Sequence, residues 1–77
     1  MTTGFVLIST APSKERSVYS ELLKIHEIVE LHAISSDHGL IAKVETKDTN
    51  HLSEIVLKRI RSIPGVIDTD TSLVVKL

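Results

Sequence analysis

Four histidines are the side chains best suited to binding a metal ion. They occupy an expected helix end, a strand, a turn and a helix start, at His26, His32, His38 and His51. No two have the i,i+4 spacing that places two imidazoles on one helix face. His32 and His38 flank an expected hairpin and could approach each other, and a symmetric oligomer could bring copies of His38 together. We interpret all four as half-exposed polar residues and expect no metal or cofactor.

Nucleophilic catalysis has little support in the residue pattern. No serine lies in a Gly-x-Ser-x-Gly motif, and the three glycines, Gly4, Gly39 and Gly65, are too far apart to form a phosphate-binding loop. Several acids lie on expected strands and turns, and we interpret them as solvated edges: Glu27, Glu30, Asp37 and Glu45. We therefore expect that the protein is not an enzyme.

Hydroxyl and carboxyl groups alternate near the C-terminus, in the sequence Asp-Thr-Asp-Thr-Ser at residues 68–72. In a strand, this alternation places hydroxyls on one side and carboxylates on the other. One interpretation is a strand with high β-propensity and a polar edge. The other is that Thr69 and Thr71 donate hydrogen bonds to a small ligand, or to backbone at a subunit contact.

The elements that must position these residues follow from hydrophobic periodicity. Residues 5–8 form a continuous apolar run, which predicts a central strand buried on both faces. Residues 14–26 repeat apolar side chains at helical spacing, with Ser13 as the expected cap. Strands at residues 29–33 and 40–44 flank a turn at residues 36–39, where Gly39 can adopt positive φ.

A second helix begins at Asp48 or Thr49 and stops at Pro64-Gly65, and a last strand covers residues 66–76. The order predicts an α+β, ferredoxin-like β-α-β-β-α-β domain over residues 1–77. Right-handed crossovers would place both helices on one face of a four-stranded antiparallel sheet.

The other sheet face needs a cover, and a second copy of the chain is the simplest one. A chain of 77 residues without cysteine has a small core and no disulfides, so self-association is expected. We predict a sheet-to-sheet dimer with an interface formed by Val6, Ile8, Leu73 and Val75.

Charge and aromatic content exclude several partners. Nine basic and ten acidic residues argue against nucleic acid or a membrane surface. Phe5 and Tyr19 are the only aromatic residues, too few for a sheet that stacks RNA bases. The N-terminus lacks a basic, apolar signal sequence, and we expect a cytoplasmic protein.

Two segments resemble the effector domain of Lrp/AsnC transcription regulators, often called the RAM domain. The first combines Glu-Ile-Val-Glu-Leu-His at residues 27–32 with Leu-Ile-Ala-Lys-Val at residues 40–44. The second, at residues 60–71, is similar to the Gly-Val-x-x-Thr-x-Thr ending of that family. The order and spacing of the two segments agree with the family over nearly the whole chain.

The resemblance implies a domain that dimerises through its sheets and builds octamers or similar rings. Small effectors, often amino acids, would bind where dimers meet. The implied ligand-binding residues are the turn and the two threonines: Ser36, Asp37, His38, Gly39, Thr69 and Thr71. The family turn usually reads Gly-x-Tyr-Asp, whereas this turn reads Ser-Asp-His-Gly. Asp37 is the anion left to hold an α-amino group, and the threonines are donors for a carboxylate.

Full members of the family carry an N-terminal helix-turn-helix, and this chain resembles only the effector domain. The resemblance therefore implies a stand-alone domain that modulates transcription by joining full-length regulators, without contacting DNA itself. Three alternatives stay open. They are a purely assembling module without a ligand, an ACT-like regulatory domain of a fused enzyme, and a small dimeric ferredoxin-like barrel enzyme that uses an inward-facing His32.

Overall fold

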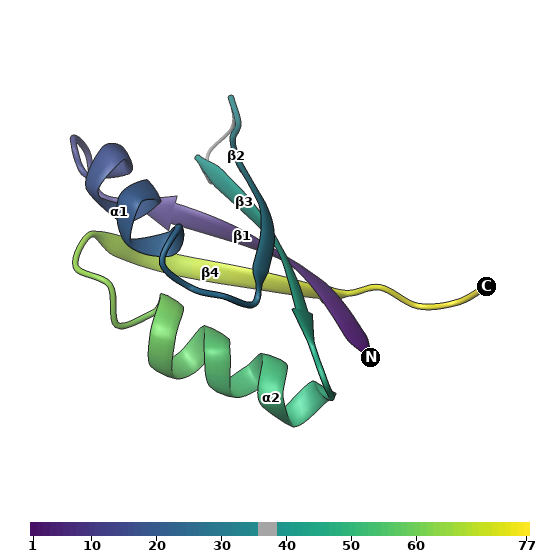
Figure 1. Ribbon diagram of the computed structural model, residues 1–77. Helices are drawn as coiled ribbons and strands as arrows, with labels where there is room; N and C mark the ends of the chain where they lie inside the picture. Colours follow the sequence, from purple (N-terminus) through teal and green to yellow (C-terminus); the bar gives the residue numbers. More distant parts are fainter. Residues whose placement is uncertain (36–38) are drawn as a thin grey trace.

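The computed structural model describes residues 1–35 and 39–77 as a four-stranded sheet with two helices packed against it (Figure 1). The elements in chain order are β1 (Thr2–Thr10), α1 (Glu15–Leu22), β2 (Ile28–Ala33), β3 (Leu40–Thr46), α2 (Thr49–Glu54), its π-helical continuation η1 (Ile55–Ile60), and β4 (Val66–Leu73). The strands lie in the order β2-β3-β1-β4, and all neighbours are antiparallel. This arrangement confirms the predicted ferredoxin-like fold with a central β1.

The core lies between the sheet and both helices. Alternate residues of β1 and β3 are buried and pair across the two strands, with Val6 opposite Ala42 and Ile8 opposite Leu40. They join apolar side chains from both helical segments in one cluster: Val6, Ile8, Val18, Leu22, Ile25, Leu40, Ala42, Val44, Leu52, Ile55, Val56, Ile60 and Ile63. Burying this cluster is the main stabilising contribution of the fold.

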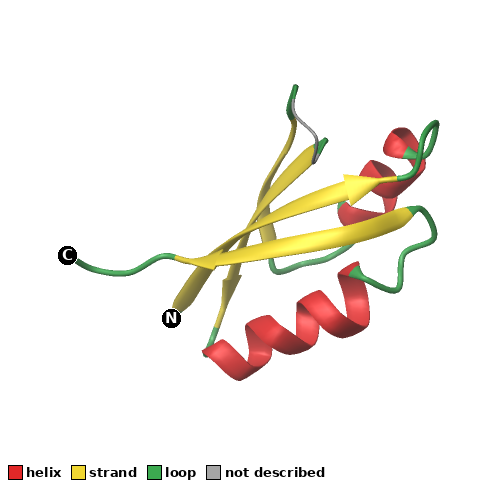
Figure 2. Ribbon diagram, turned by 180° about the vertical axis from the view of Figure 1, so that it is seen from behind, coloured by secondary structure: helices red, strands yellow, loops and turns green. Residues whose placement is uncertain are grey.

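The opposite face of the sheet is open within the described residues (Figure 2). Phe5 on β1 is 38% exposed, and its neighbours Leu7 on β1 and Ile41 on β3 are half-buried. Leu7 pairs with Ile41 across the two strands, so the three side chains share this face. We call Phe5, Leu7 and Ile41 the open-face patch. The continuous apolar run therefore has one face under the helices and one face uncovered.

The first helix is shorter than the sequence predicts. Ser13 adopts a φ of 71°, so it turns the chain and is not the helix cap. Lys14 takes the cap position and makes no side-chain hydrogen bond there. The second helix begins as expected, because Asp48 accepts a hydrogen bond of 2.8 Å from the backbone N–H of His51. Among the described residues, no helix is long and apolar enough to cross a membrane.

The second helical segment ends at Ile60, before the predicted stop at Pro64-Gly65, and Gly65 lies in the loop that leads into β4. Its φ is 102°, a conformation that residues with a side chain rarely adopt. A Cβ at this position would lie 2.8 Å from the Cβ of Lys14. The carbonyl of Gly65 also accepts a 2.8 Å hydrogen bond from the Ala11 N–H, which joins the two loops at this end of the sheet. The strand that follows ends at Leu73, three residues before its predicted end.

Candidate functional site

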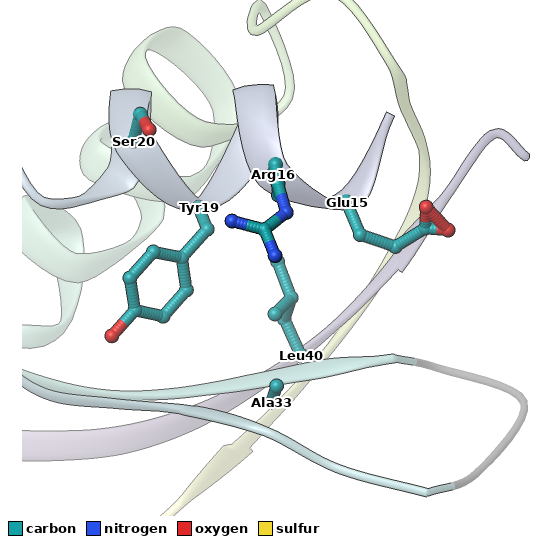
Figure 3. Close-up of a pocket in the computed structure, with 6 residues that line it drawn as sticks. All are labelled: Glu15, Arg16, Tyr19, Ser20, Ala33 and Leu40. Carbon is teal, nitrogen blue, oxygen red and sulfur yellow. The ribbon is translucent and has the colours of Figure 1, made fainter. Parts of the chain in front are cut away.

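A cleft separates α1 from the turn end of the β2 and β3 strands, and we call it the α1–hairpin cleft (Figure 3). Its volume is about 290 Å³. Four residues of α1 and one from each hairpin strand line it: Glu15, Arg16, Tyr19, Ser20, Ala33 and Leu40. Ala33 and Leu40 are cross-strand partners, so the ladder between β2 and β3 sets the floor of the cleft.

The polar groups of this cleft lie in a row along α1. Figure 3 shows Arg16 between Tyr19 and Glu15, with Tyr19 and Arg16 extending toward the hairpin strands. Tyr19 is half-buried against the core, whereas Glu15 and Arg16 are exposed. Neither charged side chain takes part in the ion pairs found among the described residues. The lining of the cleft thus includes one cation and one anion, and Figure 3 shows the carboxylate of Glu15 directed away from Arg16.

The predicted turn residues Ser36, Asp37 and His38 lie outside the described residues. Gly39, which follows them, has the expected positive φ, at 85°. Its carbonyl accepts a 2.8 Å hydrogen bond from the Ile34 N–H, which closes the described end of the hairpin beside the α1–hairpin cleft.

The two predicted threonines lie elsewhere in the same chain. On β4, Thr69 pairs with Ile8 and Thr71 pairs with Val6, so both threonines are on the helix-covered side of the sheet. Strand β1 separates β4 from the hairpin strand β3. Within one chain, β1 therefore lies between the strand that carries Thr69 and Thr71 and the strand that follows Gly39.

Thr71 instead lines a second depression, the α2–β4 groove, of about 310 Å³. No charged residue contributes to its lining, which consists of Thr49, Leu52, Ser53, Val56, Leu57, Thr71 and Leu73. This groove suits apolar groups and cannot neutralise a charged ligand with its own side chains.

The residues predicted for the dimer interface need correction. Val6 and Ile8 are fully buried in the core under the helices, so they are not available to a second copy. Leu73 pairs with Gly4 and lies toward the helices, at 46% exposure, while Val75 follows β4 and is 72% exposed. The apolar residues that do face outward from the central strands are those of the open-face patch.

Charged residues border the open-face patch on the hairpin side. His32 Nε2 lies 3.3 Å from Glu30 Oε1, and Lys43 Nζ lies 3.6 Å from Glu30 Oε2. The hydrogen bond with His32, assisted by the charge of Lys43, lowers the pKa of Glu30. His32 is 62% exposed and its acid partner is 52% exposed, so the inward-facing pair needed for a barrel enzyme is not found here.

Glu27 is not the solvated edge residue that the sequence suggested. Its side chain is 21% exposed, and Oε2 lies 3.4 Å from Nε2 of His51, which links the start of β2 to the first turn of α2. Glu27 Oε1 and His51 Nδ1 are buried and have no hydrogen-bond partner among the described residues. No sequence signal connected these two residues, because they are 24 positions apart and belong to different elements.

Comparisons with known proteins identify the family. The model of the Lrp/AsnC ligand binding domain matches residues 3–77. The HTH-type transcriptional regulator FL11 of Pyrococcus abyssi is 38% identical over 73 residues, which are 95% of this chain and 48% of that regulator. The crystal structure of FFRP-DM1 is 35% identical with a TM-score of 0.93, over 97% of this chain and 100% of that one. A transcriptional regulator from Neisseria meningitidis, solved as an L-Met complex, shares the fold with a TM-score of 0.88. The match is 23% identical and covers 97% of this chain and 50% of that one.

The chain spans about half the length of the curated regulators it matches. It also matches part of an enzyme, the homocitrate synthase of Sulfurisphaera tokodaii, with 42% identity over 60 residues. That match covers 78% of this chain but 13% of the synthase. The family model and the regulators, by contrast, match nearly all of the chain. The chain belongs to the Lrp/AsnC ligand-binding domain family of transcription regulators.

Proposed function

We propose that this chain is a cytoplasmic, amino-acid-responsive assembly domain that modulates transcription by joining full-length Lrp/AsnC regulators. The observation that carries the proposal is the match of a ligand-binding family model to residues 3–77. The Neisseria regulator with bound L-Met supports an amino acid as the effector. FFRP-DM1, which matches over its whole length, supports residues 1–77 acting as one stand-alone domain.

Self-association would occur first through the open-face patch. Phe5, Leu7 and Ile41 form an apolar surface on the two central strands, and water contact with such a surface is unfavourable. A second copy packed sheet to sheet would cover the same patch on both chains, as a two-fold interface requires. The bordering charges of Glu30 and Lys43 would then lie at the rim of this interface.

The effector would bind where such dimers meet in an octamer or similar ring. Gly39 precedes β3 and Thr71 is on β4, and β1 lies between these two strands, which supports a site that combines two chains. We propose that Ser36, Asp37, His38 and Gly39 of one chain face Thr69 and Thr71 of another. An effector bound across two dimers would stabilise the ring by its differential affinity for the assembled state.

A thermal-unfolding screen against the twenty amino acids, at fixed protein concentration, tests this function. A ligand at 100 times its Kd adds about 2.7 kcal/mol to the stability of the folded state. In a domain of this size, each kcal/mol raises the Tm by roughly 4–8 °C. One or two amino acids should therefore raise the Tm visibly. A flat screen from a well-folded protein would leave an assembly module without an amino-acid ligand.

A second candidate is a regulatory module that acts on an enzyme, which the partial homocitrate synthase match favours. Such a module would bind an amino acid but would not join a transcription regulator. Mixing the chain with a purified full-length Lrp/AsnC regulator and measuring co-elution separates the two candidates. A mixed complex supports the transcriptional role, and independent elution at all effector concentrations favours the enzyme module.

A further inference from the structure

We propose that His32 of one chain contacts Asp70 of a second copy, reciprocally, and that this contact orients the sheet-to-sheet dimer and tightens it in mild acid. This inference rests on the proposed function, because it names a regulation of the open-face interface. The two residues lie far apart in the sequence, and strand pairing places both on the uncovered face of the sheet (Figure 2).

His32 and Asp70 are at opposite ends of one row of side chains on the open face. Cross-strand partners share a face of an antiparallel sheet. In the strand order β2-β3-β1-β4, the row consists of His32, Ile41, Leu7 and Asp70. It therefore has an imidazole at one edge, a carboxylate at the other, and two members of the open-face patch between them. Four strands make such a row roughly 14 Å long, so its two ends do not meet within one chain.

A two-fold axis parallel to the strands, passing between β3 and β1, pairs opposite charges at both edges. This rotation reverses the strand order, so that β2 of one chain covers β4 of the other and the apolar middle of the row covers its own copy. His32 of each chain then faces Asp70 of the other. Packed sheets cross at about 30°, which displaces an edge strand by roughly 4 Å. Asp68, two residues along β4 on the same face, is therefore the second acid near His32.

The other two-fold arrangement, with its axis across the strands, is electrostatically worse. It places each strand over its own copy. Asp68 and Asp70 would then meet the same two acids of the second chain at the β4 edge. Both are exposed, and neither takes part in the ion pairs found among the described residues. Like charges that oppose each other across an interface disfavour it, so charge complementarity favours the strand-reversed dimer.

The surroundings of His32 leave one of its ring nitrogens for the second copy. Among the described residues of its own chain, the charged groups beside it are Glu30 and, through Glu30, Lys43. Glu30 Oε1 lies 3.3 Å from His32 Nε2. A protonated imidazole has two N–H donors, so Nδ1 can donate to the carboxylate of Asp70 while Nε2 donates to Glu30.

The direction of the pH effect follows from this contact. A histidine side chain gains its positive charge as the pH falls from about 8 to about 5. A carboxylate of the second copy favours the charged imidazole, so the dimer binds a proton at each His32 more tightly than the separated chains do. By linkage, acidification through this range shifts the equilibrium toward the dimer.

Analytical ultracentrifugation at about pH 8 and about pH 5.5 measures the dimer Kd of the wild type and its variants. His32→Gln and Asp70→Asn each remove one partner, and the double variant completes a thermodynamic cycle. Glu30→Gln removes the acid of the same chain. His26→Gln is the matched control, because His26 is an exposed histidine between α1 and β2, outside the sheet. It corrects for the general loss of repulsion near the pI of about 6.4.

We expect the wild-type dimer to be roughly 2- to 30-fold tighter at the acidic pH, the effect of two exposed ion pairs per dimer. Glu30→Gln and His26→Gln should keep this pH dependence. His32→Gln and Asp70→Asn should lose it, and the double variant should lose no more than either single one. A fixed positive charge in His32→Lys should give the tighter Kd at both pH values.

The failures of the two proposals can be told apart. A dimer whose Kd is independent of pH, or whose pH dependence survives Asp70→Asn, would overturn this inference and leave the open-face dimer intact. Loss of the pH dependence in Glu30→Gln but not in Asp70→Asn would overturn the strand-reversed orientation. A wild type that is monomeric at both pH values would refute the dimer and this inference together. All the substituted side chains are exposed, and circular dichroism verifies that each variant is folded.

Discussion

Replacing Phe5 with glutamate tests whether the open face of the sheet is the dimer interface. Phe5 is the most exposed member of the open-face patch, and its cross-strand neighbours are Lys43 on β3 and Ser72 on β4. The new carboxylate would lie opposite Lys43, so the substitution should leave the single chain folded. In a sheet-to-sheet dimer, however, it would place two carboxylates in an apolar contact.

The expected loss of affinity follows from the area that Phe5 still exposes. A phenylalanine side chain has roughly 200 Å² of surface, and 38% of it, about 75 Å², remains to be buried by a partner. At about 25 cal/mol per Å², that burial contributes about 1.9 kcal/mol per chain. A two-fold interface counts the residue twice, so the substitution costs about 4 kcal/mol. This corresponds to an increase in Kd of about 500- to 1,000-fold.

Analytical ultracentrifugation over a series of concentrations measures this change. Leu23→Glu is the matched control, because Leu23 is an exposed leucine, at 61%, on the helical side of the molecule. Phe5→Glu should dissociate at concentrations where the wild type and Leu23→Glu remain dimeric, with circular dichroism unchanged. A Phe5→Glu protein with wild-type Kd would refute the open-face interface, as would a wild type that stays monomeric.

Three further variants test the effector site, a loop and an electrostatic contact. Thr69→Ala combined with Thr71→Ala should weaken amino-acid binding in calorimetry while sedimentation shows an intact dimer. Gly65→Ala should destabilise the fold by about 1–3 kcal/mol in urea unfolding, because its φ is 102° and the added Cβ would meet Lys14. Glu30→Gln should lower stability at neutral pH, and its difference from the wild type should vanish in acid, since the pKa of Glu30 is lowered in the folded state.

The sign of the Glu30 effect follows from proton linkage. A carboxyl whose pKa is lowered by folding stabilises the fold above its unfolded pKa, and that contribution is lost as the pH falls through the lowered value. Urea unfolding of both proteins at neutral and at acidic pH measures the difference. An equal difference at both pH values would mean that the ionised side chain has no role. For Gly65→Ala, a urea unfolding midpoint equal to that of the wild-type protein would show that the loop accommodates a side chain by shifting Lys14.

Local sequence patterns were sufficient for the order of the elements and for several of their ends. Alternation in the strands and 3.6-residue periodicity in the helices depend on residues near in sequence, so they can be read without knowing the fold. The same holds for Asp48, whose carboxylate caps the second helix by accepting a hydrogen bond from the N–H three residues on, and for the positive φ of Gly65 in the loop before β4, although the helix itself ends earlier, at Ile60. The family motifs at residues 27–44 and 60–71 are also local, and they pointed to the correct family.

Facing directions and long-range neighbours were decided by the tertiary structure alone. An unbroken apolar run such as residues 5–8 does not reveal which alternate residues face the helices, and the fold placed Val6 and Ile8 inside and Phe5 and Leu7 outside. Glu15 and Arg16 have the ordinary composition of a first helical turn, and only the packing of α1 over the hairpin made them walls of a cleft.

The separation of the threonines from the turn has the same physical origin. Thr69 and Thr71 are placed by the pairing of β4 with β1, and Gly39 by the pairing of β3 with β1 on its other edge. These pairings join residues more than 30 positions apart, and no local preference encodes how far two such positions end up from each other. The sequence by itself therefore determined the fold and the family of this protein. Which residues of the chain lie next to one another was decided by strand pairing and helix packing in three dimensions.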